Sequence, residues 1–184
     1  MNSVKSVTYG AMVVGLASII LLADRLLLGN LGFLFSLIIP IHLVVYGTKF
    51  SLKESVAVYF TMIVASFIFN GLLPAIISTV CFGLIGLIMI YTQKQRYAFL
   101  KRNLILFFSM SLAYFIMIRF FSVYFGVSIE DTITFIKEHA PQLAYNITII
   151  FTYGSILVTI LMEMYILNTA SSILQNRLFK GPNK

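Results

Sequence analysis

The chain alternates between long apolar runs and short polar connections. A helix rises about 1.5 Å per residue and a hydrocarbon core is roughly 30 Å thick, so runs of this kind can cross a bilayer as helices. We predict six spans, at about residues 7–27, 31–48, 54–69, 72–92, 103–125 and 145–174. The pattern therefore predicts an all-α, polytopic membrane protein with six transmembrane helices, in which residues 1–184 form a single integral membrane domain.

Two connections between the runs carry local signals. Asn70 and Gly71 alone separate the third and fourth spans, which predicts a tight turn within an apolar hairpin. The longest connection precedes the sixth span, and there Ser128 followed by Asp131 resembles a capping box, with isoleucines recurring at helical spacing. We expect a short amphipathic helix over about residues 128–140, which either covers the mouth of a cavity or serves as an interfacial linker.

Composition and charge agree with a membrane protein. The chain is 60% hydrophobic and 10% charged, more apolar than a soluble domain of 184 residues can bury. The net charge of +7 comes from scattered basic residues that build no basic face, which disfavours nucleic acid as a partner. The basic residues on the predicted inner side are Lys5, Lys49, Lys53, Lys94, Arg96, Lys101, Arg102, Arg177, Lys180 and Lys184.

The positive-inside bias then predicts the topology. It places both termini in the cytoplasm and the loops after the first, third and fifth spans outside, together with Asp24, Glu130, Asp131 and Glu138. We expect a multi-pass protein of a cell membrane, most simply a bacterial plasma membrane. The basic loop after the fourth span serves as a topology signal, or it contacts acidic membrane lipid headgroups or a cytoplasmic partner.

Arg119 is the polar residue of the fifth span that most needs an explanation. An arginine at bilayer depth costs at least about 2.5 kcal/mol, so it usually faces the protein interior or a wet cavity. Arg119 falls in the last third of the crossing, where it either lines a binding cavity or reaches to the interface. Asp24, at the end of the first span, either pairs with Arg25 or reaches Arg119 from a neighbouring helix.

The sixth span is the most polar one. Thr148, Thr152, Ser155 and Thr159 follow one another at helical spacing and end at Glu163. Single hydroxyl groups in spans usually bond to their own backbone. Glu163 lies deep in the span, so we expect it to be protonated or paired, and too far from Arg119 to meet it if both helices are straight.

Two further features concern helix packing. Pro40 lies inside the second span, and His42 is expected to serve a backbone carbonyl there rather than a metal ion. Ala11, Gly15 and Ser18 place small side chains on one side of the first span, a spacing that lets another backbone approach closely. They serve either internal packing or the docking of a partner subunit.

Catalytic motifs are missing. The sequence has no phosphate-binding G-x-x-x-x-G-K-[ST] loop, no H-E-x-x-H helix and no G-x-S-x-G elbow. These absences disfavour an enzyme, and no cofactor is expected. Polar side chains from several predicted spans come together near the outer half of the protein. This arrangement suits the binding of a ligand more than catalysis.

Two segments resemble a known family. The A-M-V-V-G sequence at Ala11–Gly15 is similar to the small-residue motif in the first helix of the substrate-binding S components of energy-coupling factor (ECF) transporters. The sequence P-I-H-L-V-V-Y-G-T-K-F at Pro40–Phe50 resembles their second helix. The acidic connection before the sixth span and the tail I-L-Q-N-R-L-F-K also look similar to the YybS-like group of membrane proteins, which is grouped near S components.

The resemblance implies a six-helix bundle that binds a small water-soluble micronutrient, such as a vitamin, in an outward pocket formed by spans four to six. It also implies a transmembrane coupling subunit and two ATPase subunits as partners. The protein would topple over within the membrane when it meets the coupling subunit, and would then release the ligand inside the cell. Within this hypothesis Arg119 donates two hydrogen bonds to an anionic or carbonyl group of the ligand. The candidate ligand-binding residues are Arg119, Tyr114, Asn146, Tyr153 and Asp24, and the candidate docking residues are Ala11, Gly15 and Ser18.

Two other hypotheses for the function stay open. In the first, the protein is a membrane scaffold or assembly protein without a small ligand, and its polar groups hold helices together. In the second, which is less favoured, it is a small channel whose pore is lined by the polar stripe from Thr148 to Glu163.

Overall fold

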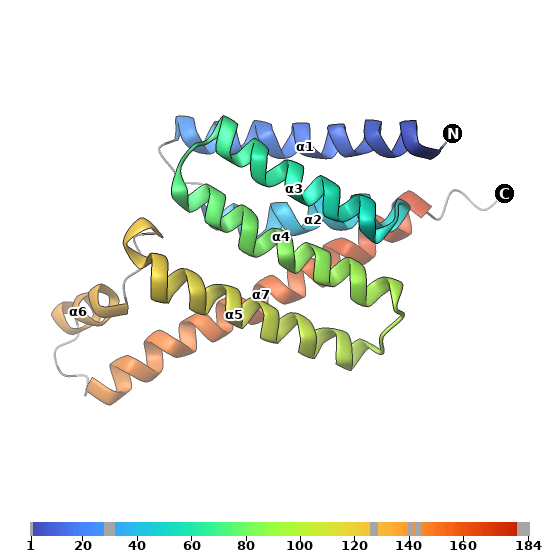
Figure 1. The fold of residues 1–184 in the computed structure, drawn as a ribbon. Helices are drawn as coiled ribbons and strands as arrows, with labels where there is room; N and C mark the ends of the chain where they lie inside the picture. Colours follow the sequence, from blue (N-terminus) through green and yellow to red (C-terminus); the bar gives the residue numbers. More distant parts are fainter. Residues whose placement is uncertain (1, 28–31, 126–128, 140–141, 143–144, 180–184) are drawn as a thin grey trace.

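The computed structural model describes residues 2–27, 32–125, 129–139, 142 and 145–179, and these residues are helical apart from short connections. The helices are α1 (Asn2–Leu26), α2 (Gly32–Lys49), α3 (Leu52–Phe69), α4 (Leu73–Lys94), α5 (Phe99–Phe125), α6 (Ile129–His139) and α7 (Tyr145–Phe179) (Figure 1). The predicted all-α class is confirmed.

Five of the helices are long and apolar enough to cross a membrane. They are Val4–Leu26, Leu52–Phe69, Ala75–Lys94, Phe99–Phe120 and Tyr145–Ile173, in α1, α3, α4, α5 and α7. The second predicted span also forms a helix, but its apolar part, Leu34–Lys49, is shorter than the other five. The protein is thus a multi-pass membrane protein with five membrane-length helices in the described chain, and α2 packs among them.

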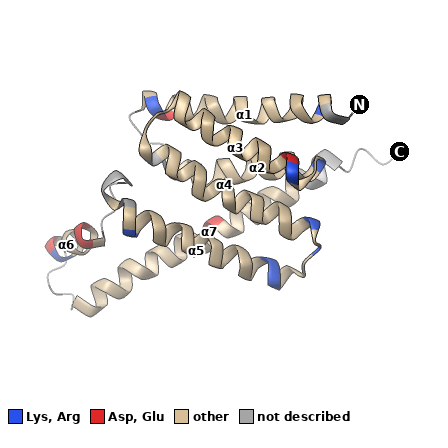
Figure 2. Ribbon diagram, in the orientation of Figure 1, with Lys and Arg blue, Asp and Glu red and all other residues tan. Residues whose placement is uncertain are grey.

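The helices form a layered bundle with two distinct ends. α2 packs mainly against α4, while α3 lies between α1 and α4, and α7 crosses both α2 and α5. The first turn of α1 and the last turn of α7 lie at one end of the bundle, and α6 lies at the other, which we call the α6 end (Figure 1). Charged residues gather toward the ends of the helices (Figure 2), as expected where apolar segments meet lipid.

The predicted turn between the third and fourth spans is present. Asn70 ends α3 as its C-cap, and Gly71 adopts a φ of 70°, a conformation that glycine reaches without steric cost. The backbone N–H of Gly71 donates to the carbonyl of Ser66 at 3.1 Å. At the other end of α3, Ser51 and Glu54 form a reciprocal capping box that the sequence analysis did not identify.

Glycine residues allow α2 and α4 to approach closely. A Cβ atom at Gly86 would lie 3.0 Å from Cα and 3.2 Å from the carbonyl oxygen of Pro40, which are both backbone atoms. The two helices can therefore only accommodate a side chain at Gly86 by moving apart.

We expect Gly86→Ala to lower the thermal unfolding midpoint of the detergent-purified protein, with a loss of about 1–3 kcal/mol in the free energy of unfolding. Gly154→Ala is the matched control, because a Cβ atom there meets nothing within 4 Å. Alanine favours helix more than glycine does, so the control should be neutral or stabilising. Equal stability of the two variants would contradict the close packing of α2 on α4.

Pro40 and His42 have structural environments. Pro40 lies inside α2 and is buried. The Nδ1 atom of His42 lies 2.7 Å from the carbonyl oxygen of Ile38, one turn earlier, so the ring bonds to the backbone of its own helix. His42 thus contacts a backbone carbonyl, as expected, but the carbonyl is that of Ile38 and not the one four positions before Pro40.

The amphipathic helix before the sixth span is also confirmed as α6. None of the α6 side chains is buried, although the helix packs against α7. Ser128, the expected capping residue, lies outside the described residues. The position of α6 on the end of the bundle brings it over the space between α5 and α7.

Candidate ligand cavity and helix groove

A cavity of about 890 Å³ opens between α5, α6 and α7. Its lining residues are Ser111, Tyr114, Phe115, Ile118, Arg119, Ser122, Ile129, Glu130, Asp131, Tyr153, Ile156, Leu157 and Ile160. A volume of this size accommodates a small organic molecule. The cavity lies toward the α6 end of the bundle.

Helical periodicity explains how α5 and α7 contribute to this cavity. Its residues on α5 run from Ser111 to Ser122 at spacings of three and four, which places them on one face of the helix. The residues from Tyr153 to Ile160 follow the same rule on α7. Because the two faces point into the space between the helices, residues distant in sequence share one chamber.

Three predicted ligand residues lie together in this cavity: Tyr114, Arg119 and Tyr153. Tyr114 is half-buried, and its ring packs edge-on against Phe82 of α4 with centroids 6.0 Å apart. Arg119 and Tyr153 are exposed. The cavity lining thus combines the packed ring of Tyr114, the guanidinium group of Arg119 and the more exposed ring of Tyr153.

The first turn of α6 adds negative charge to the opposite wall. Glu130 and Asp131 line the cavity with Arg119, so side chains of both signs face one space. The sequence analysis did not propose these two carboxylates, or Ser111 and Ser122, as site residues. The two serines could have been found, because they share the helical face of Tyr114 and Arg119.

Asn146 does not line the cavity. It lies exposed in the first turn of α7, beyond Tyr153. Asn146 is therefore not among the residues that surround the cavity together with Tyr114 and Arg119.

Asp24 also lies outside the cavity, and its contact is with Asn70, whereas the sequence left a pairing with Arg25 or with Arg119 open. The Nδ2 group of Asn70 donates to Oδ2 of Asp24 at 2.8 Å and to the carbonyl oxygen of Leu21 at 2.9 Å. Asp24 and Asn70 are each only 2% exposed. Arg25 instead donates to the carbonyl oxygen of Phe69 at 3.5 Å. Asp24 thus joins α1 to the turn after α3.

We expect Asp24→Ala to destabilise the fold by about 1–3 kcal/mol, because it leaves the buried amide of Asn70 without that acceptor. Thermal unfolding of the purified protein measures this loss. Asp24→Asn is the matched control, since it keeps an oxygen acceptor and should lose less. An Asp24→Ala variant as stable as the wild type would contradict this structural role.

The hydroxyl groups of α7 bond mainly to its own backbone. The hydroxyls of Thr152, Ser155 and Thr159 donate to the carbonyls of Thr148, Thr152 and Ser155 at 3.0, 2.7 and 2.9 Å. Thr148 and Thr152 are buried, whereas Ser155 and Thr159 are exposed. The stripe is therefore buried at its first two positions and exposed at the next two.

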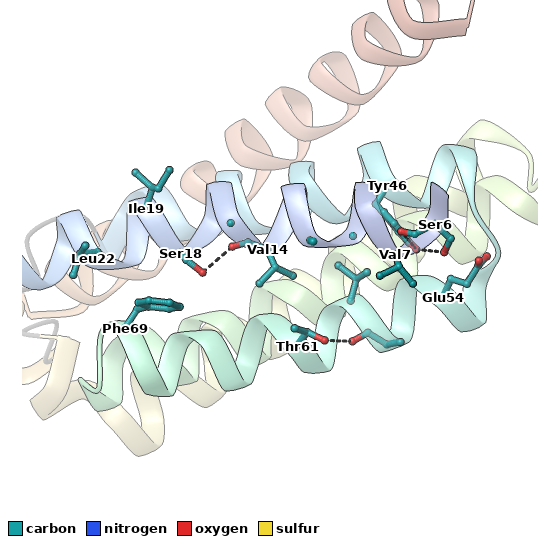
Figure 3. A pocket seen from close by; sticks show the side chains of 15 residues that line it. Ser6, Val7, Val14, Ser18, Ile19, Leu22, Tyr46, Glu54, Thr61 and Phe69 are labelled. Carbon is teal, nitrogen blue, oxygen red and sulfur yellow. Dashed lines mark hydrogen bonds between the residues drawn. The ribbon is translucent and has the colours of Figure 1, made fainter. Parts of the chain in front are cut away.

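A second concave feature is a groove of about 780 Å³ between α1 and α3 (Figure 3). All three candidate docking residues, Ala11, Gly15 and Ser18, line it. A Cβ atom at Gly15 would meet nothing within 4 Å, so the space in front of it is open. The hydroxyl of Ser18 donates to the carbonyl of Val14 at 2.8 Å, which leaves the wall of the groove largely apolar.

Sequence comparison places the chain in a family of membrane proteins. The family described as predicted membrane protein (DUF2232) matches residues 15–148, which is more than half of the chain. The chain belongs to the DUF2232 family. No curated protein and no solved structure gives a significant match. The DUF2232 match agrees with the multi-pass architecture and covers α2 to α6, including the α5 and α6 walls of the cavity.

Proposed function

We propose that this DUF2232 protein is the substrate-binding S component of an ECF-type importer and captures a small water-soluble micronutrient from outside the cell. The observation that carries the proposal is the position of Arg119 on the wall of a cavity of about 890 Å³, beside Tyr114 and Tyr153. The resemblance of Ala11–Gly15 and Pro40–Phe50 to S components supplies the class of transporter.

The cavity suits a polar ligand with an apolar body. Arg119 offers a planar fork of donors to a carboxylate, phosphate or carbonyl group of the ligand. Glu130 and Asp131 accept hydrogen bonds from its amino or hydroxyl groups. The rings of Tyr114 and Tyr153 then contact its flat or apolar part. In this proposal α6 lies over the outward opening, and both termini lie in the cytoplasm of a bacterial cell.

The groove between α1 and α3 is the proposed docking surface for the transmembrane coupling subunit, which two separate ATPases energise. Small residues such as Ala11, Gly15 and Ser18 let a helix from another subunit approach closely within lipid, where packing rather than the hydrophobic effect holds helices together.

The experiment is purification of the full chain from its native membrane in mild detergent. Small molecules released on denaturation and proteins that copurify are both identified by mass spectrometry. We expect one polar compound in near-equimolar amount, together with a membrane subunit and ATPases. A chain that carries neither a compound nor ATPase partners would contradict the proposal.

A second candidate function is a membrane scaffold without a small ligand. The open groove beside Gly15 favours it, because this surface offers a helix-binding site independently of the cavity. Copurification of an unrelated membrane protein, with no retained compound, would select the scaffold.

A further inference from the structure

A carboxyl group lies just inward of the cavity, where α2, α5 and α7 meet. Glu163 follows the cavity-lining residue Ile160 by three positions on α7, about one helical turn. The hydroxyl of Ser36 on α2 donates to Oε1 of Glu163 at 2.5 Å. Tyr114 of α5, itself part of the cavity wall, interacts with both Glu163 and Ser36.

The second carboxyl oxygen of Glu163 has no such partner. Oε2 is buried and makes no hydrogen bond within the described part of the chain. Among the described residues, the side chains that act on this carboxyl group are those of Ser36 from α2 and Tyr114 from α5, and both carry neutral hydroxyl groups. α6, which also packs on α7, contributes no charge to it.

A carboxylate in this position would be a buried charge with no cation beside it in the part of the chain that the structure describes. Such a charge costs many times more than a neutral acid, and a protein commonly avoids it by binding a proton. Protonation removes this charge, and Oε1 can still accept the hydrogen bond from the Ser36 hydroxyl.

We propose that Glu163 is a proton-binding site, a neutral carboxylic acid that joins α2, α5 and α7 and positions Tyr114 as the inner wall of the cavity. The site does not require that the cavity bind a micronutrient. It makes Glu163 a positioning residue, acting on the cavity through the tyrosine side chain.

Infrared spectroscopy of the full-length protein in detergent at neutral pH tests this directly. We expect the carbonyl stretching band of a protonated carboxylic acid in the wild type and its loss in Glu163→Gln. Glu138→Gln is the matched control, because Glu138 is exposed on α6, and that variant should lose only carboxylate absorption. Loss of carboxylate absorption, with no acid band, in Glu163→Gln would overturn the proposal.

The link to Tyr114 is tested in the same spectra with Glu163 intact. We expect Tyr114→Phe and Ser36→Ala each to shift the acid band, since each removes a hydroxyl beside the carboxyl group. Tyr153→Phe removes a tyrosine hydroxyl elsewhere in the cavity and should leave the band in place. A band that neither Tyr114→Phe nor Ser36→Ala moves would overturn the positioning role. Because the spectra need no ligand, they remain decisive whether or not the proposed transport function holds.

Discussion

Arg119→Ala is expected to reduce the compound retained by the purified protein by about 10- to 100-fold. A hydrogen bond to a charged group contributes about 1.5–3 kcal/mol, and each 1.4 kcal/mol is tenfold in affinity. Arg119 is exposed to the cavity rather than buried in the core, so its loss should leave the thermal unfolding midpoint unchanged. The measurement is the amount of compound released on denaturation per mole of protein.

Arg25→Ala is the matched control for this prediction. Arg25 is an exposed arginine at the end of α1 and contacts the carbonyl oxygen of Phe69, outside the cavity. The control should retain the compound as the wild type does. Arg119→Lys should recover only part of the binding, because an ammonium group lacks the planar two-donor geometry. Wild-type retention by Arg119→Ala would remove Arg119 from the site.

The second large effect is expected at the groove. Replacing both Ala11 and Gly15 with leucine should abolish copurification of the partner subunit, because the larger side chains fill the space that a partner helix would occupy. Ala11 and Gly15 are both exposed, and a Cβ atom at Gly15 meets nothing within 4 Å, so the fold and the retained compound should be unaffected. Mass spectrometry of the purified complex measures both outcomes.

Thr8→Leu is the control on the same helix. Thr8 is exposed on α1 but does not line the groove, so leucine there should leave the complex intact. If the double leucine variant still copurifies with the partner in wild-type amounts, the docking surface lies elsewhere on the protein.

The helices could be predicted from the sequence because the signals are local. Runs of apolar residues fix where membrane-length helices lie, and Asn70 with Gly71 fixes the turn between α3 and α4. The isoleucine spacing likewise predicts α6. The second predicted span, at about residues 31–48, likewise matches α2 (Gly32–Lys49).

The site could be predicted only in part, because it depends on how each helix is rotated and tilted. Tyr114 and Arg119 both line the cavity, although five positions set them about 140° apart around α5, so spacing alone does not bring them together. Spacing does not reveal that Asp24 turns toward Asn70 instead. The depth assigned to Glu163 assumed straight, upright helices, whereas α7 runs obliquely across α2 and α5 (Figure 1), and Glu163 meets Ser36 near the start of α2.

The central claim is that the space between α5, α6 and α7 holds a small ligand. An experimental structure of the protein purified with its retained compound tests this most directly, because it locates the compound. We expect density for the compound inside this cavity, within hydrogen-bond distance of the Arg119 guanidinium and against the ring of Tyr114. An empty cavity, with the compound bound instead in the groove between α1 and α3, would contradict the account.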